Sequence, residues 1–538
     1  MQGQAQVFSL THHLRLLWMM FLSCICLTAC QLPKNQALSS EESRPKLSLS
    51  KQSTAEVLQN YNVWLDADNY QNNVAQGLTG YYALDNSFLS LASRIHMIRH
   101  AKYQIDVQYY IWADDEIGHI LLAELLNAAE RGVQVRLIID DQNGTDLDQT
   151  LIALSQHPNF QIKLYNPYKY RYFRVADYLL RAKQINRRMH NKLLIADGFV
   201  ALTGGRNVSN EYFEASQDFQ FSDMDVMFVG TAVAQASQVF ANFWTDELSY
   251  PVTQMIEKPA DHALETQRKH YQEFLSEQRS SARLQKVEEM IREYGQGRQY
   301  EWTEAHFVGD NPSKTKGNGK DDDLIANQIS HLIATPAQRI SIVSAYFVPQ
   351  KAGTANLTAQ SIAGVKSTIL TNSLVANDVA MVHAFYQKYR RDLVESGVKL
   401  YEFKPYIHRK EKSWYEVLTG NVLPAKSRDR SSLHAKFFLS DDQVFIGSFN
   451  CDPRSMNLNT EVGLVIRSPS LANAIETQLE QYLPYIAYQV QLDNQGQLIW
   501  LERFENGQSK THHQEPQTTA FQRGLVKIIS WLPIESMM

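Results

Sequence analysis

Hydrophobic and polar positions along the body of the chain predict strands that alternate with helices. The strand-like pattern occurs at residues 105–111 and again at 340–348, each time after a helical stretch. In both places an amphipathic stretch and a Gly-Val step lead into a further apolar strand, within residues 131–139 and 363–370. A third Gly-Val step opens residues 397–401. The repetition predicts two similar α/β domains, each a central sheet flanked by helices.

The length of 538 residues accommodates these two domains and several connecting segments. Between the halves, residues 265–294 are charged with helical spacing, and residues 311–323 are rich in Gly, Lys and Asp. The expected boundaries are a signal segment at 1–30, a tether at 31–70, an N-terminal domain at 71–250, a helical and loop connection at 251–325, a C-terminal domain at 326–500 and a C-terminal extension at 501–538.

The N-terminus contains an apolar run at residues 16–29, preceded by Arg15. A run of this length is short for a membrane-spanning helix but suits the core of a secretory signal. It ends in Leu-Thr-Ala-Cys, which resembles the lipobox of bacterial lipoproteins, so Cys30 is the predicted lipidation site. We therefore expect a membrane-anchored lipoprotein of the bacterial cell envelope. An uncleaved helical anchor is the alternative, and the choice between inner and outer membrane stays open.

Composition excludes several classes of protein. Apolar residues make up 44% of the chain and charged residues 20%, which excludes wholesale disorder. The net charge of −5 excludes a globally basic nucleic-acid coat protein. Three of the four cysteines lie in the signal segment and only Cys451 lies in the body, so the mature chain has no internal disulfide and no cysteine-based zinc site.

Each half carries one His-x-Lys cluster, followed by an acid and a Gly-x-x-Asn turn. The first cluster consists of His190, Lys192, Asp197 and Asn207, and the second of His434, Lys436, Asp441 and Asn450. The apolar residues after each lysine are strand-like, so the histidine and the lysine two positions later point to the same face. The Gly-rich turn brings the asparagine back towards them. Two facing halves would therefore supply a pair of each side chain.

This set of side chains suits phosphodiester chemistry. The two lysines and two asparagines can hold non-bridging phosphate oxygens and offset their charge. One histidine can attack phosphorus while the other protonates the leaving alcohol. A carboxylate behind each imidazole would fix its tautomer, and Asp225 and Glu461 are the candidates at matching places. No metal or other cofactor is implied, because the lysines supply the positive charge.

The two clusters resemble the paired HKD motifs of the phospholipase D superfamily, over most of residues 75–500. The resemblance implies two phospholipase-D-like domains with one active site at their interface. It also implies that His190 forms a phosphohistidine, that His434 acts as acid and then base, and that Asp197 and Asp441 have a supporting role. The second motif is one residue shorter between its acid and its glycine, which leaves Asp442 open as a substitute for Asp441.

Finer features resemble bacterial cardiolipin synthases of the C type. These are Tyr-Asn-Pro at 165–167, the segment 450–461 that follows the second motif, and the tail at 515–516 and 532–535. The resemblance implies transfer of a phosphatidyl group to phosphatidylglycerol in a phospholipid membrane, from phosphatidylethanolamine or phosphatidylglycerol. No nucleic acid is expected as a partner, and an accessory protein stays open. A hydrolytic phospholipase D, a superfamily endonuclease and a non-enzymatic lipid-binding lipoprotein are the alternatives.

A basic and aromatic stretch precedes each catalytic histidine. The first spans residues 163–188 and the second spans residues 404–430. Basic side chains attract anionic headgroups, and Tyr and Trp favour the membrane interface, so both stretches are predicted to surround the mouth of the site. A solvated loop with aromatic core contacts and a single-stranded nucleic-acid surface are the alternatives.

Overall fold

The structure is a computed structural model that describes residues 32, 35, 51–63, 65–213, 223–278, 281–294, 299–377, 379–405 and 432–537. The predicted signal segment with Cys30 lies outside the described residues. So does the part of the second basic stretch that follows residue 405 up to residue 430.

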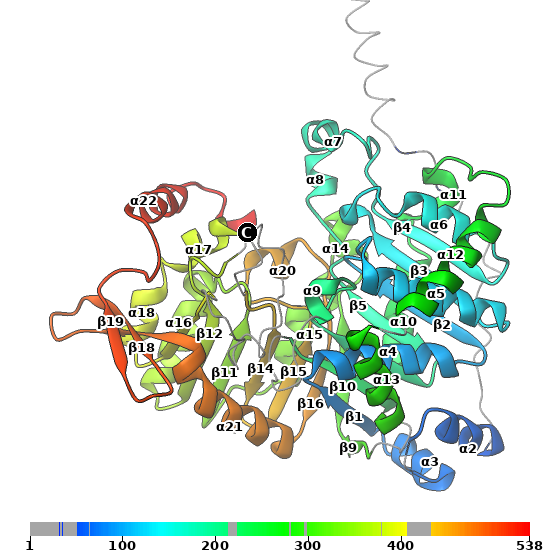
Figure 1. Ribbon diagram of the computed structural model, residues 1–538. Helices are drawn as coiled ribbons and strands as arrows, with labels where there is room; N and C mark the ends of the chain where they lie inside the picture. Colours follow the sequence, from blue (N-terminus) through cyan, green and yellow to red (C-terminus); the bar gives the residue numbers. More distant parts are fainter. Residues whose placement is uncertain are drawn as a thin grey trace, which may run out of the picture.

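Two mixed sheets form two halves of the molecule, which lie side by side (Figure 1). The first sheet has the order β8 (Ser249–Pro251), β4 (Phe160–Tyr165), β3 (Gln134–Asp140), β2 (Gln104–Tyr109), β5 (Lys192–Ala196), β6 (Val200–Gly204), β7 (Asp225–Gly230), β1 (Thr79–Leu84) and β9 (Glu301–Thr303). The second has the order β10 (Ala305–Gly309), β16 (Val462–Arg467), β15 (Gln443–Gly447), β14 (Lys436–Ser440), β11 (Arg339–Ser344), β12 (Lys366–Asn372), β13 (Lys399–Phe403), β17 (Ala487–Leu492), β18 (Leu498–Arg503) and β19 (Ser509–His512).

The two sheets repeat one another strand by strand. The order β4-β3-β2-β5-β6-β7-β1 corresponds to β13-β12-β11-β14-β15-β16-β10. In each sheet the first three of these strands are parallel, and the hairpin that follows the histidine pairs antiparallel beside them. The predicted pair of similar α/β domains is therefore confirmed.

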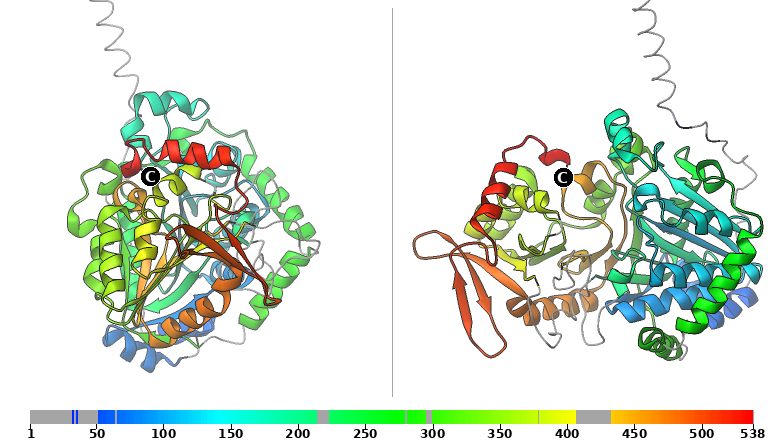
Figure 2. Two further views of the ribbon diagram at one scale, coloured as in Figure 1. Left: turned by 90° about the vertical axis from the view of Figure 1, so that its left-hand side faces the viewer. Right: turned by 45° about the horizontal axis from the view of Figure 1, so that its top comes forward.

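Helices cover the sheets, and the views in Figure 2 show them around both halves. On the first half they are α2 (Lys51–Asn60), α3 (Ala67–Ala75), α4 (Ser87–His100), α5 (Glu116–Glu130), α6 (Asp148–Leu154), α7 (Arg174–Leu180), α8 (Ala182–Ile185), α9 (Asn210–Phe213), α10 (Thr231–Trp244), α11 (Val252–Met255), α12 (Ala263–Gln278) and α13 (Ala282–Tyr294). The later ones are α14 (Ser313–Lys316), α15 (Ile325–Leu332), α16 (Gln350–Ile362), α17 (Ala380–Tyr386), α18 (Arg390–Glu395), α20 (Pro453–Asn457), α21 (Pro469–Ile486) and α22 (Ala520–Ile529). Short 3-10 turns are η2 (Asp141–Asn143), η3 (Asp321–Asp323) and η4 (Glu535–Met537).

One apolar core is shared by the two halves. It joins side chains of β5, β6, β7 and α10 to side chains of β14, β15, β16 and α21, for example Phe228 and Phe240 with Phe437 and Leu464. A second core on the other face of the first sheet holds α4 and α5. Because the shared core lies beneath β5 and β14, the histidines that precede these two strands come together at the domain interface.

Several segments lie differently from the predicted boundaries. Helix α2 falls in the range predicted as a tether, yet Val57 and Leu58 are buried in the core of the first half. Within the predicted connection, β9 belongs to the first sheet and β10 to the second. The predicted C-terminal extension adds β19 to the second sheet. Across the described residues, no helix has the length and apolarity that crossing a bilayer requires.

Candidate active site

The two His-x-Lys clusters occupy the same place in the two sheets. Lys192 pairs with the last residue of β2, and Lys436 pairs with the last residue of β11. His190 and His434, two residues earlier, therefore lie at the carboxyl edge of the parallel strands. All four side chains are buried, the histidines with only 8% and 7% of their surface exposed.

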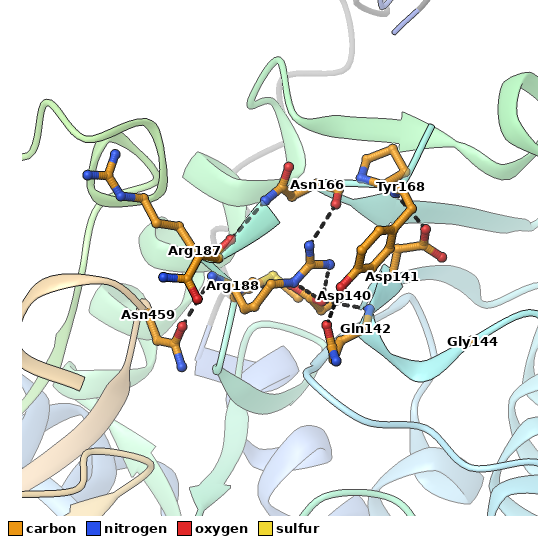
Figure 3. A network of polar contacts seen from close by, with 12 residues as sticks. Asp140, Asp141, Gln142, Gly144, Asn166, Tyr168, Arg187, Arg188 and Asn459 are labelled. Atoms are coloured by element: carbon orange, nitrogen blue, oxygen red, sulfur yellow. Dashed lines mark hydrogen bonds and ion pairs between the residues drawn. The ribbon is translucent and has the colours of Figure 1, made fainter. Parts of the chain in front are cut away.

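The backbone around His190 pairs with a segment of the other half. The His190 amide donates to the carbonyl of Thr460 at 2.9 Å, and the Thr460 amide donates to the carbonyl of Arg188 at 2.9 Å. Figure 3 shows the Arg188 guanidinium on Asp140, at the end of β3, and the Arg188 amide on the side chain of Asn459. These contacts fix the first histidine against residues 459–461.

Each histidine is bound to a carboxylate from the opposite half. Nδ1 of His190 lies 2.8 Å from Oε2 of Glu461, and Nδ1 of His434 lies 2.8 Å from Oδ2 of Asp223. A carboxylate on Nδ1 holds the proton there, which leaves Nε2 of a neutral imidazole with its lone pair available. The structure thus contains two His–carboxylate pairs that cross the domain interface.

The prediction of Asp225 as an orienting carboxylate was wrong. Asp225 is buried, and its Oδ2 lies 3.0 Å from Arg94 and 3.3 Å from Arg206. The sheet register explains the difference: Asp225 pairs with Gly204, whereas Gly447 pairs with Gly463, so Asp223 is the counterpart of Glu461. Two acids two positions apart point to the same face of a strand, and hydropathy alone does not choose between them.

Glu461 is held by hydrogen bonds to residues that the sequence did not predict as part of the site. Its Oε1 accepts a hydrogen bond from Ser455 at 2.9 Å, and its Oε2 accepts one from the Ser448 hydroxyl. Its backbone amide donates to Oδ2 of Asp310 at 2.8 Å, and Asp310 in turn lies 2.8 Å from Lys314. Asp310 and Lys314 come from the segment between the halves, which has no repeat partner to reveal it.

The turn that follows each hairpin shapes the space for its carboxylate. A Cβ on Gly205 would lie 2.1 Å from Oδ1 of Asp223, which is far too close, so only glycine fits there. The corresponding residue of the second half is Ser448, and its hydroxyl binds the longer Glu461. Each turn therefore holds the carboxylate of its own half, and that carboxylate reaches the histidine of the other.

The predicted phosphate-binding asparagines differ in their contacts. Asn207 donates through Nδ2 to the hydroxyl of Tyr212 at 2.8 Å, and the Tyr212 ring packs edge-on against His434 with centroids 4.9 Å apart. Oδ1 of Asn450 is buried without a hydrogen-bond partner in the described part of the chain. Tyr110 packs edge-on against His190 at 4.8 Å, as Tyr212 does against the second histidine.

The acids within the motifs do not reach the histidines. Asp197 accepts hydrogen bonds from the amides of residues 102, 103 and 104, and Asp441 accepts them from the amides of residues 337, 338 and 339. Both residues have positive φ, 54° and 53°. The two acids tie the hairpin to the start of the neighbouring strand, and the equivalent of Asp197 is Asp441 rather than Asp442.

Comparison with known proteins identifies the family. The sequence model of a family described as "Cardiolipin synthase, PLD-like domain" matches residues 94–244 and 329–483, one segment in each half. The chain belongs to this family. This confirms the resemblance to the phospholipase D superfamily.

Cardiolipin synthase C of Escherichia coli (strain K12) is 38% identical to this chain over 467 residues, which cover 85% of this chain and 96% of that protein. An uncharacterized protein of Helicobacter pylori (strain ATCC 700392 / 26695) is 32% identical, with 82% and 86% covered. The crystal structure of a phosphatidylserine synthase of Haemophilus influenzae Rd KW20 superposes with a TM-score of 0.54 at 16% identity, and covers 91% of this chain and all of that one. It shares the fold.

Burial sets the protonation of this phospholipase-D-like site. It lowers the pKa of both His190 and His434 well below the usual value, and the nearby Lys192 and Lys436 lower both further. Burial also lowers the pKa of Lys192 to about 7. For the carboxyl groups burial acts in the opposite direction and raises the pKa of Glu461 and of Asp223 to about 7. The site therefore favours neutral imidazoles.

Much of the first basic stretch is internal, so the prediction that it surrounds the mouth of the site is only partly right. Arg188 is buried on Asp140, and Arg171 is buried on two acids. The ammonium of Lys163 donates to a backbone carbonyl at 2.9 Å. These arginines and this lysine stabilise the loops that carry His190. Exposed aromatic and aliphatic side chains remain at residues 172–180.

Among the described residues, no group of three or more His, Cys, Asp or Glu side chains is placed to hold a metal ion. The positive charge at the histidines comes from Lys192 and Lys436. The Nζ atoms of both lysines donate to the carbonyl of the histidine two positions earlier, which holds the two ammonium groups beside the imidazoles.

Proposed function

We propose that this protein is a phosphatidyltransferase that makes cardiolipin by moving a phosphatidyl group from one phospholipid to the hydroxyl of phosphatidylglycerol. The observation that carries the proposal is the pair of His–carboxylate contacts with a lysine beside each histidine, in a chain that is 38% identical to a cardiolipin synthase over nearly all of that relative's length. Such a site has a nucleophile, an acid and a phosphate clamp.

In the first step, Nε2 of neutral His190 attacks the phosphorus of the donor lipid. The N–P bond forms, the bond from phosphorus to the headgroup oxygen breaks, and His434 gives its proton to the leaving alcohol. Glu461 stabilises the positive charge that develops on His190. The bound phosphodiester anion raises the pKa of His434, so this imidazole can carry the proton once the substrate is in place.

In the second step, the hydroxyl of phosphatidylglycerol attacks the phosphohistidine. His434 accepts the hydroxyl proton, the N–P bond breaks and cardiolipin leaves with His190 restored. Lys192 and Lys436, together with the amides of Asn207 and Asn450, hold the non-bridging oxygens in both steps. Water in place of the second lipid would give phosphatidic acid, which is the product of a hydrolytic phospholipase D.

We further propose that the protein acts at a membrane of the bacterial cell envelope, anchored through a lipid on Cys30. The support is the Leu-Thr-Ala-Cys sequence after an apolar run of signal length. Lipid attachment keeps an enzyme at the bilayer that holds its substrates. Mass spectrometry of the mature N-terminus tests this, since an unmodified residue 30 would exclude it.

The deciding experiment uses the purified protein in vesicles of phosphatidylethanolamine and phosphatidylglycerol, with a chelator present, beside the His190→Ala variant. The wild type is expected to form cardiolipin and the variant to lose activity by about 10⁴-fold or more, because the nucleophile is gone. Products are identified by mass spectrometry. Phosphatidic acid and free headgroup without cardiolipin would instead establish a hydrolase.

A further inference from the structure

Two exposed apolar surfaces lie on one side of the molecule, one in each half. The α7 surface consists of Tyr172, Phe173, Val175, Leu179 and Leu180, and the α22 surface consists of Phe521, Leu525, Ile528, Trp531 and Leu532. Figure 1 and the left view of Figure 2 both place α7 and α22 at the top. Most other exposed large apolar side chains of the described chain are scattered singly.

Helix α22 has apolar side chains on two adjoining faces, and only one of them packs on the protein. Val526 is buried and Ile529 is half-buried against the second half. Phe521, Leu525 and Ile528 follow the spacing i, i+4, i+7, which places them together on a face that the structure leaves exposed. Such an apolar face is costly in water unless something covers it.

The segment that carries α22 is firmly attached to the second half. Glu515, a few residues before the helix, is buried on His383 at 2.9 Å and on Arg390 at 2.7 Å. After the helix, Glu535 binds Lys388 at 2.9 Å. The exposed face is therefore presented by a fixed helix.

Helix α20 connects both surfaces to the active site. It follows Asn450 after two residues, and its Arg454 donates to the carbonyl of Asn186, directly after α8, at 2.9 Å. The turn η4, at the end of the α22 segment, packs on α20 within the second half. Figure 1 and the right view of Figure 2 show α20 between α7 and α22. The two surfaces thus flank the part of the interface that carries the site.

The charges around the two surfaces favour an anionic partner. Residues 520–534 contain no acid, and Asp177, the one acid within 172–183, is buried and paired with Arg181 at 2.7 Å. Lys183 and Lys527 are exposed beside the apolar side chains. Exposed Trp, Tyr and Phe next to lysines are the composition of surfaces that lie in the headgroup region of a bilayer.

We propose that the α7 surface and the α22 surface together dock the protein on an anionic phospholipid bilayer, with α20 and the histidines held against the headgroups between them. The proposal rests on the proposed function, because a phosphatidyltransferase must reach lipids that stay in the membrane. It adds that bilayer access depends on two contact points, one from each half, besides any N-terminal anchor.

The first test compares bilayer and soluble substrates. The full chain is reconstituted in phosphatidylglycerol vesicles, so that the N-terminal segment is the same in every variant. Phe521→Ser with Leu525→Ser, and Tyr172→Ser with Leu179→Ser, should each lower the transfer rate on vesicle lipid about tenfold or more. Both should keep the wild-type rate on short-chain phosphatidylglycerol dissolved as monomers, since the site is untouched.

The matched control is Ile362→Ser. Ile362 is 76% exposed, close to the 78% of Phe521, but it precedes β12 and so lies at the edge of the sheet opposite His434. It should keep the wild-type rate on both substrates. An equal loss in this control, or an unchanged vesicle rate in both double variants, would overturn the proposal.

The second test does not depend on activity. Trp531 fluorescence, taken as the difference between the wild type and Trp531→Phe, should be quenched in vesicles that contain brominated acyl chains. An absence of quenching would mean that the bilayer does not cover the α22 surface, which would overturn the proposal. If the α22 variant then had a lower oligomeric mass than the wild type, the surface would be assigned to contact with a second copy of the chain. Quenching without cardiolipin formation on any substrate would support the docking surface and contradict the proposed function.

Discussion

The two histidines of the active site are held by the same type of contact, but the carboxylate and the turn residue differ between them. His190 is held by the longer Glu461, which is surrounded by the hydroxyls of Ser448 and Ser455. His434 is held by the shorter Asp223, which fits against a turn that has glycine in place of Ser448. The second half thus has one methylene more in the acid and one hydroxymethyl group more in the turn.

The surroundings of the two carboxylates differ as well. Behind Asp223 lies a buried charged cluster in which Asp225 binds Arg94 and Arg206. Behind Glu461 lies the ion pair between Asp310 and Lys314, from the segment that joins the halves. Glu461, the carboxylate that binds the proposed nucleophile His190, is therefore supported by a segment outside the repeat.

The comparison shows why one half alone cannot form a complete site. Each half contributes one histidine and one carboxylate, but the carboxylate that binds each histidine comes from the opposite half. The shared apolar core beneath β5 and β14 brings the two together, so assembly of the interface also sets the tautomer of both imidazoles. Catalytic competence and domain packing are thus coupled.

Among the residues that support the two histidines, the largest effect is expected when a carboxylate loses its charge. Asp223→Asn and Glu461→Gln should each lower the rate of phosphatidyl transfer about 10³-fold, because the imidazole no longer has its proton held on Nδ1. Product formation by mass spectrometry at saturating lipid measures this, and a loss of this size with both variants supports the crossed arrangement.

Asp225→Asn is the control for these variants. It leaves Arg94 in a buried site without its partner and should lower the free energy of unfolding by about 3 kcal/mol, measured by chemical denaturation. Its folded fraction keeps the contact between His434 and Asp223. If the Asp225 variant loses transfer as severely as Asp223→Asn while it remains folded, the crossed assignment fails.

The second effect concerns the turns. Gly205→Ala places a methyl group where Oδ1 of Asp223 lies and should reduce transfer about 10²-fold by displacing that carboxylate. Ser448→Ala creates the same Gly-Ala turn in the other half but only removes the hydroxyl that donates to Glu461 and accepts from the Val462 amide, so a loss of about threefold is expected. Equal losses would mean that the two turns are interchangeable after all.

The positions of the paired side chains could be predicted where they depend on local geometry. The spacing of His190, Lys192 and Asn207, and its recurrence in the second half, needs only the alternation of a strand and a turn. The choice between Asp223 and Asp225 could not be predicted in this way, because it depends on which residue pairs with Gly204 across the sheet. Asp310, Lys314 and the exposed face of α22 depend on packing between distant segments, for which no local pattern exists.

The pH dependence of the rate distinguishes the two lysines. Burial lowers the pKa of Lys192 to about 7, so this ammonium loses its proton as the pH rises through 7. The value of kcat/KM should fall about fivefold from pH 7 to pH 8, since the uncharged amine no longer holds the phosphate. His190 must be neutral to attack phosphorus, and its lowered pKa keeps it neutral throughout this pH range.

Arginine substitutions test the assignment of that alkaline limb. Lys192→Arg keeps its charge at high pH and should move the limb upward, at a lower absolute rate, because a guanidinium does not replace an ammonium in geometry. Lys436→Arg leaves Lys192 in place and should keep the limb near pH 7. A limb that stays near pH 7 in Lys192→Arg would assign it to another group that must carry a proton, which in this mechanism is the general acid His434.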